Sequence, residues 1–112
     1  MIKYTLNGDM VAEFGLCENR HDYPVAECIF PEAIPTFAFG KLEVMAKQVL
    51  LPLVQQGLKK LVVYTSGCIS ALLSVINAAQ QLHIREIVVM HYDGQLNDYQ
   101  PQQIITTNCI YF

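Results

Sequence analysis

A short polar loop, Thr65-Ser66-Gly67-Cys68-Ile69-Ser70, follows an apolar run and carries the first residues that could do chemistry. Glycine lets a backbone approach a ligand closely. The first N–H groups of a helix have no acceptor within that helix, so they attract anions, most commonly phosphate. The loop therefore predicts an anion-binding site. In the competing interpretation, Ser66 or Thr65 only caps the helix and Gly67 only permits a tight turn.

A second loop, Met90-His91-Tyr92-Asp93-Gly94, ends the next apolar run. Side chains alternate along a strand, so His91 and Asp93 share one face with Tyr92 between them. An imidazole and a carboxylate in this arrangement can perform acid–base chemistry or hold a divalent metal ion. Alternatively, Asp93 and Gly94 form an ordinary turn and His91 packs under the sheet. The residues alone leave both interpretations open.

Two further residues lie at the ends of the segment between these loops. Helix N-termini favour the reactive thiolate form of cysteine, so Cys68 is a candidate nucleophile. The segment that follows lacks the arginine that a phosphatase-type loop needs, which makes this the weaker hypothesis. His83 falls at the other end, where an imidazole complements the helix dipole. Taken alone, His83 is better explained as a helix-end residue than as a catalyst.

The elements that position these loops can be predicted from hydrophobic periodicity. An alternating segment around Asn7-Gly8-Asp9 predicts an N-terminal hairpin. Two segments with apolar residues at helical spacing and two continuous apolar runs predict two main helices and two buried strands, with the second helix in a central βαβ unit. The predicted ranges are a hairpin at 2–14, a helix at 40–56, a strand at 58–64, a helix at 68–83 and a strand at 87–90. Proline-rich residues 15–40 predict a loop with one uncertain strand at 25–30, and a final strand is expected at 104–112.

Composition narrows the class of protein. The chain has 112 residues, of which 53% are hydrophobic and 15% charged. We therefore expect one α/β domain spanning residues 1–112 with an apolar face for a second copy. A net charge of −3 with seven Lys plus Arg argues against binding of long nucleic acids. The four cysteines show no zinc-ligand spacing and are expected to be free thiols. With no signal-peptide pattern and no membrane-spanning run, we expect a cytoplasmic protein.

Three stretches together carry a family resemblance: the strand and loop 61–67, the helix end Gln80-Gln81-Leu82-His83, and the strand end 87–93. In this order they resemble the small CRISPR-associated Rossmann-fold (CARF-like) proteins, and most of all the stand-alone ring nucleases of type III CRISPR systems. The resemblance covers roughly the last two-thirds of the chain. It implies a Rossmann-like (CARF-like) sheet with an N-terminal β-hairpin.

The resemblance also implies a function. Such proteins bind cyclic tetra-adenylate, a cyclic oligoadenylate second messenger, across a homodimer and cleave it, which switches off type III CRISPR signalling. By position, His83 and Asp93 would be the catalytic residues. Thr65 to Ser70 and His91 would bind the ligand. No cofactor is required, although a divalent metal ion (Mn²⁺ or Mg²⁺) could take part.

Two alternatives remain beside the ring nuclease. The family often has a basic residue after the aspartate, whereas this chain has Gln95 in that region. This departure favours a non-catalytic sensor or sponge that uses the same loop. The second alternative is a cysteine-dependent phosphoryl- or sulfur-transfer protein that uses Cys68 as its nucleophile.

Overall fold

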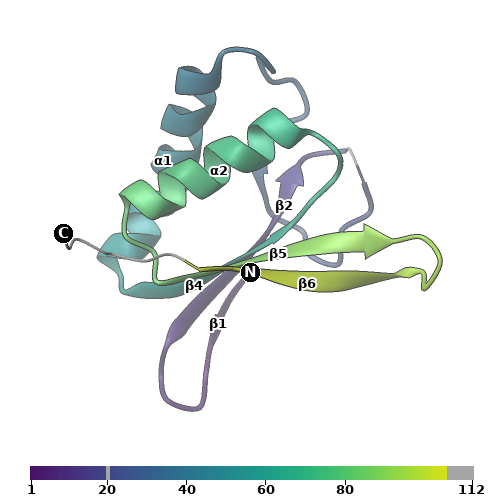
Figure 1. The fold of residues 1–112 in the computed structure, drawn as a ribbon. Helices are drawn as coiled ribbons and strands as arrows, with labels where there is room; N and C mark the ends of the chain where they lie inside the picture. Colours follow the sequence, from purple (N-terminus) through teal and green to yellow (C-terminus); the bar gives the residue numbers. More distant parts are fainter. Residues whose placement is uncertain (20, 106–112) are drawn as a thin grey trace.

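The computed structural model describes residues 1–19 and 21–105 (Figure 1). It consists of an open sheet and two helices, which confirms the α/β class and is compatible with a Rossmann-like fold. Along the chain the elements are β1 (Ile2–Tyr4), β2 (Met10–Cys17), β3 (Cys28–Phe30), α1 (Phe39–Gln55), β4 (Leu58–Tyr64), α2 (Ile69–Gln81), β5 (Glu86–Asp93) and β6 (Asp98–Ile105).

The six strands form one mixed sheet in the order β1-β2-β4-β5-β6, with β3 paired to β2. Strands β2, β4 and β5 are parallel and form its centre. Strand β1 pairs antiparallel with β2, so the predicted hairpin is confirmed. The β4–α2–β5 segment is the predicted βαβ unit, with its two strands adjacent and parallel.

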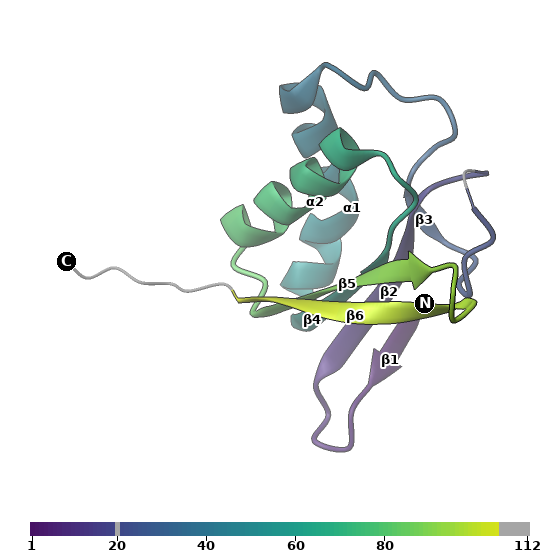
Figure 2. The same cartoon turned by 45° about the vertical axis from the view of Figure 1, so that its right-hand side comes forward.

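Both helices cover the same face of the sheet, as Figures 1 and 2 show from two directions. Two consecutive right-handed crossovers that advance in the same direction put their helices on one side. The core lies in this layer. In-register Ala12, Leu61 and Ile87 are fully buried there. Leu42, Ala46 and Leu50 of α1 and Ala71, Val75 and Ala78 of α2 complete it.

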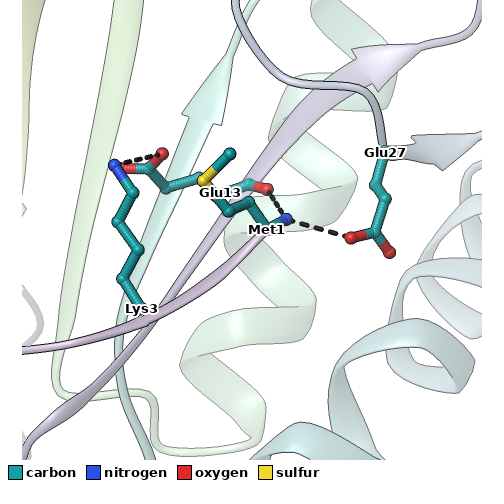
Figure 3. A network of polar contacts seen from close by, with 4 residues as sticks. All are labelled: Met1, Lys3, Glu13 and Glu27. Atoms are coloured by element: carbon teal, nitrogen blue, oxygen red, sulfur yellow. Dashed lines mark hydrogen bonds and ion pairs between the residues drawn. The ribbon is translucent and has the colours of Figure 1, made fainter.

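No helix among the described residues covers the opposite face, which we call the bare face. Alternation places Glu13, Val62 and Val88 in one row across it. Lys3 Nζ lies 3.3 Å from a Glu13 carboxylate oxygen, which joins β1 to β2 (Figure 3). The Met1 ammonium group lies 3.1 Å from Glu27 and donates to the Glu13 carbonyl oxygen at 2.8 Å. Ionic contacts thus tie the hairpin to the segment before β3.

The last strand differs from its prediction. It begins at Asp98 rather than Ile104, because Asp98 and Tyr99 already pair with Asp93 and Tyr92. A run of exposed glutamines gave this edge strand no apolar alternation from which its start could be read. Residues 106–112 of the predicted strand lie outside the described residues.

The outer edge of β6 offers few hydrogen-bond donors to another strand. Thr65 N–H donates to the Met90 carbonyl oxygen at 3.1 Å, so the backbone groups of Met90 face β4. Its antiparallel partner, Pro101, consequently turns its backbone away from β5, and proline has no N–H to offer. Nearby, Tyr99 N–H donates to the Asp98 carboxylate at 2.8 Å.

In residues 1–19 and 21–105 there is also no helix long and apolar enough to cross a membrane.

Candidate functional site

The carboxyl ends of β4 and β5 lie side by side and border a cavity of about 290 Å³, which we call the strand-end cavity. Open α/β sheets bind ligands at this edge, where strand-following loops meet helix N-termini. Four of the predicted ligand-binding residues meet here, together with two residues that were not predicted as ligand contacts. The lining residues are Thr65, Ser66, Gly67 and His91, with Tyr92 and His21.

The loop between β4 and α2 has the backbone of a binding loop. Gly67 has φ +81°, a conformation that other residues adopt only with strain. Cys68 is the N-cap of α2 and makes no side-chain capping hydrogen bond. Thr65 Oγ1 instead donates to the Met90 carbonyl oxygen at 3.4 Å. The alternative in which Ser66 or Thr65 caps the helix is therefore wrong, and the first amides of α2 remain available to a ligand.

Ser66 points into the protein rather than toward the helix start. Its Oγ is buried and makes no hydrogen bond of normal geometry to any described residue. Burial raises the pKa of the Tyr23 phenol above its usual value. The nearby Ser66 hydroxyl lowers the pKa of Tyr23 by a smaller amount. The Cys17 N–H donates to the Tyr23 phenol oxygen at 3.4 Å, which fixes the ring beneath the loop.

Four tyrosines and His21 gather on the bare face beside the cavity, and we call them the tyrosine cluster: Tyr23, Tyr64, Tyr92, Tyr99 and His21. The His21 ring centroid lies 5.0 Å from that of Tyr92 and 5.9 Å from that of Tyr99, both edge to face. The Tyr99 hydroxyl is buried and has no hydrogen-bond partner among the described residues. Burial is the main reason that the pKa of Tyr99 is raised.

His91 lies on the other side of the cavity. A smaller cavity of about 160 Å³ brings His91 together with Thr65, Gly67, Cys68, Ile69 and Leu72, so its side chain is on the helix-covered side. His91 Nε2 lies 2.8 Å from the Gln102 side-chain oxygen. The residue is exposed, so the alternative in which it packs under the sheet is wrong.

The two residues given catalytic roles by the resemblance are not brought together within one chain. Asp93 ends β5, where its Oδ1 accepts hydrogen bonds from the N–H groups of Gln95 (2.9 Å) and Leu96 (3.4 Å), as the turn interpretation expects. His83 follows α2 with φ +59° and precedes β5. The length of β5 separates them, about 20 Å at the usual rise per residue.

The remaining predicted residues are at the start of α2. Cys68 Sγ lies 3.8 Å from Ser70 Oγ, and the Ile69 side chain is exposed. Cys17, Cys28 and Cys68 form no disulfide with one another, as expected, whereas Cys109 lies outside the described residues. Within the described part of the chain, no three His, Cys, Asp or Glu side chains gather as a metal site would require.

Fold and site together define a small α/β domain with a ligand-sized cavity at the carboxyl edge of its parallel strands. No protein-family model, no curated protein and no solved structure matches this chain. The cavity is therefore the main guide to its function.

Proposed function

We propose that this protein binds a cyclic oligoadenylate such as cyclic tetra-adenylate at the strand-end cavity, with two copies of the chain sharing one ring, and that it opens the ring. The observation that carries the proposal is the pairing of two surfaces around one cavity. The Thr65–Gly67 loop, which leads directly into the uncapped start of α2, borders one side, and aromatic rings border the other. A nucleotide presents the matching pair, an anionic phosphate and a flat base.

The phosphate side is supported by the loop at the start of α2. Backbone amides at a helix N-terminus stabilise a negative charge without any basic side chain. This matters in a chain with net charge −3 and only seven Lys plus Arg. A two-fold axis through the ligand would double the number of these amides.

The base side is supported by the tyrosine cluster. Tyr92 is 42% exposed at the rim, while its ring makes edge-to-face contacts with His21 and Tyr99. A ring held in this way offers a face for stacking at little entropic cost. Stacking of a base on an aromatic side chain contributes about 1–3 kcal/mol.

The size of the cavity supports sharing of the ligand. Its volume is about 290 Å³. This lies at the lower end of the range that encloses a drug-sized ligand, and a ring of four nucleotides is larger. One copy can thus hold only part of the ring. His83 and Asp93 lie at opposite ends of β5, so they could act on one phosphodiester only if they came from different copies of the chain.

Binding can be tested by calorimetry with cyclic tetra-adenylate and two matched pairs of variants. Gly67→Ala strains the loop, whereas Gly8→Ala imposes a similar strain at φ +84° in the distant hairpin turn. Tyr92→Ala removes the rim ring, whereas Tyr4→Ala removes a ring that is 68% exposed on β1. We expect one ring per two chains and an affinity about 10-fold weaker or more for Gly67→Ala and Tyr92→Ala only.

Two results would contradict the proposal. The first is the absence of binding by the unmodified protein. The second is an equal loss of affinity in the Gly8→Ala and Tyr4→Ala controls, which would mean that the variants act through stability rather than through the cavity.

A further inference from the structure

The strand-end cavity contains two histidines that come from distant parts of the chain. His21 belongs to the loop between β2 and β3, and His91 lies near the end of β5. Both side chains are exposed, and both line the same cavity of about 290 Å³ as Thr65, Ser66 and Gly67. A ligand held by this loop would therefore meet two imidazoles.

The two imidazoles lie on opposite sides of the sheet. Consecutive residues of a strand point to opposite faces, so His91 and Tyr92 diverge. His91 shares the smaller cavity with Ile69 and Leu72 of α2, which places it on the helix-covered side. Tyr92 packs against His21, which belongs to the tyrosine cluster on the bare face. The Gly67 loop lines the strand-end cavity together with both histidines.

We propose that His91 and His21 are the general base and general acid that open the cyclic oligoadenylate. In-line displacement at phosphorus puts the attacking and leaving oxygens on opposite sides of the phosphate. A base and an acid that enter one cavity from opposite sides of the sheet fit that requirement. The inference rests on the proposed function, because it assumes that a ring phosphate occupies the strand-end cavity.

The step is balanced without any co-reactant. His91 takes the proton from a ribose 2′-hydroxyl, and that oxygen forms a bond to the adjacent phosphorus. The bond from phosphorus to the 5′-oxygen breaks, and His21 gives its proton to the leaving oxygen. The products carry a 2′,3′-cyclic phosphate at one end and a 5′-hydroxyl at the other. Amides at the start of α2 can stabilise the charge that develops on the phosphoryl oxygens.

Gln102 supports the choice of His91 as the base. Its side-chain oxygen lies 2.8 Å from His91 Nε2. An amide oxygen only accepts hydrogen bonds, so the proton in this contact is on Nε2. In the neutral imidazole that a general base requires, Nδ1 then carries no proton and can accept one. His21, on the side of the leaving oxygen, is assigned the acid.

The test compares three single histidine variants: His21→Ala, His91→Ala and His83→Ala. Each is incubated with cyclic tetra-adenylate, and the products are followed by chromatography and mass spectrometry. We expect His21→Ala and His91→Ala each to lose about 10²–10⁴-fold in turnover, the usual contribution of one acid or base. Added imidazole should restore part of the activity, because the cavity is open to solvent; a residue needed only for folding would not respond.

Binding is measured separately with a ring whose 2′-hydroxyls are methylated, which removes the nucleophile. The unmodified protein and both cavity variants should bind this ring within about tenfold of one another. Failure of the unmodified protein to bind it would overturn the proposed function itself. Binding of both rings without opening of the unmodified ring would overturn the acid–base pair and the ring-opening part of the proposed function, and would leave a sensor or sponge. If His83→Ala lost turnover while His21→Ala turned over at the rate of the unmodified protein, the His91–His21 assignment would also be overturned. The pair implied by the resemblance, His83 and Asp93, would then be favoured.

Discussion

The two faces of the sheet differ in what covers them and in what they contain. One face is covered by α1 and α2 and is lined by aliphatic side chains with no exposure, such as Leu61 and Ile87. On the bare face lie the Lys3–Glu13 ion pair and the tyrosine cluster. The strand-end cavity is where the two faces meet, since one of its histidines belongs to each side.

This difference separates two tasks. Aliphatic packing between helices and sheet supplies most of the favourable free energy of folding. Polar and aromatic groups on the bare face add less stability for each residue, but they can contact a ligand. Substitutions should therefore separate into those that unfold the protein and those that change the site.

The largest effect on stability is expected from the covered face. Leu61→Ala removes a fully buried side chain in the central strand and should lower the free energy of unfolding by about 2–5 kcal/mol. Its neighbour Val62, 7% exposed on the bare face, is the comparison. Val62→Ala should cost about 1 kcal/mol. Urea unfolding followed by circular dichroism measures both, and equal losses would mean that the two faces do not differ in this way.

A smaller effect is expected where the bare face meets the loop before β3. A Cβ atom at Gly15 would overlap the Tyr23 ring, so Gly15→Ala should displace that ring and cost about 1–3 kcal/mol. It should also weaken ligand binding, because Tyr23 packs beneath Ser66 and against His21. The control is Gly40→Ala, where a Cβ meets nothing and alanine favours the helix. If Gly15→Ala leaves both the stability and the affinity unchanged, Tyr23 does not position the site.

The tyrosine cluster should make stability depend on alkaline pH. Burial raises the pKa of Tyr99 above its usual value of about 10, so the unfolded chain ionises first. The stability that Tyr99 contributes through this raised pKa is fully present below about pH 10. It is lost as pH rises through the higher pKa of Tyr99 in the folded protein. Tyr99→Phe should reduce this alkaline loss. At neutral pH the Tyr99→Phe substitution should raise the free energy of unfolding by about 1 kcal/mol, because it removes a buried hydroxyl that has no hydrogen-bond partner among the described residues.

Unfolding titrations at neutral pH and above about pH 10 measure both parts of this prediction. The exposed Tyr4 provides the matched control, since Tyr4→Phe should change neither. If the Tyr99→Phe protein lost as much stability at alkaline pH as the unmodified protein, Tyr99 would not be the source of that loss.

The smallest effect is expected from an exposed ion pair on the bare face. Lys60 Nζ and a Glu86 carboxylate oxygen lie 3.9 Å apart, with 36% and 40% of their side chains exposed. Lys60→Gln should change the free energy of unfolding by about 0.5 kcal/mol or less, and less still in high salt. A loss above about 1 kcal/mol would show that this face contributes more to stability than its exposure suggests.

Sequence periodicity predicted the elements that pack against one another. The strand at 58–64 matches β4, and the two helices fall within two residues of α1 and α2, because buried faces impose a regular apolar spacing. Strand β6 was placed six residues too late at its start, since an exposed edge strand needs no such spacing. The strand expected at 25–30 is limited to Cys28–Phe30.

The site was only partly predictable for a related reason. Loops that follow buried strands can be placed at the carboxyl edge, which is how Thr65 to Ser70 and His91 were predicted there, although His91 lies within β5 and not in a loop. His21 lies in a loop without periodicity, and its position depends on Tyr23 packing over Gly15, a contact between distant elements. A histidine next to an aspartate and a tyrosine was the one local signal there.

The outer edge of β6 has a consequence for proteins kept at high concentration. Edge strands with free donors join the sheets of neighbouring molecules and start aggregates. Here Pro101 supplies no donor, and the Tyr99 N–H is already bonded to Asp98. The edge beside the strand-end cavity is thus protected against sheet extension, and the two copies that we propose to share one ligand would not polymerise through this edge.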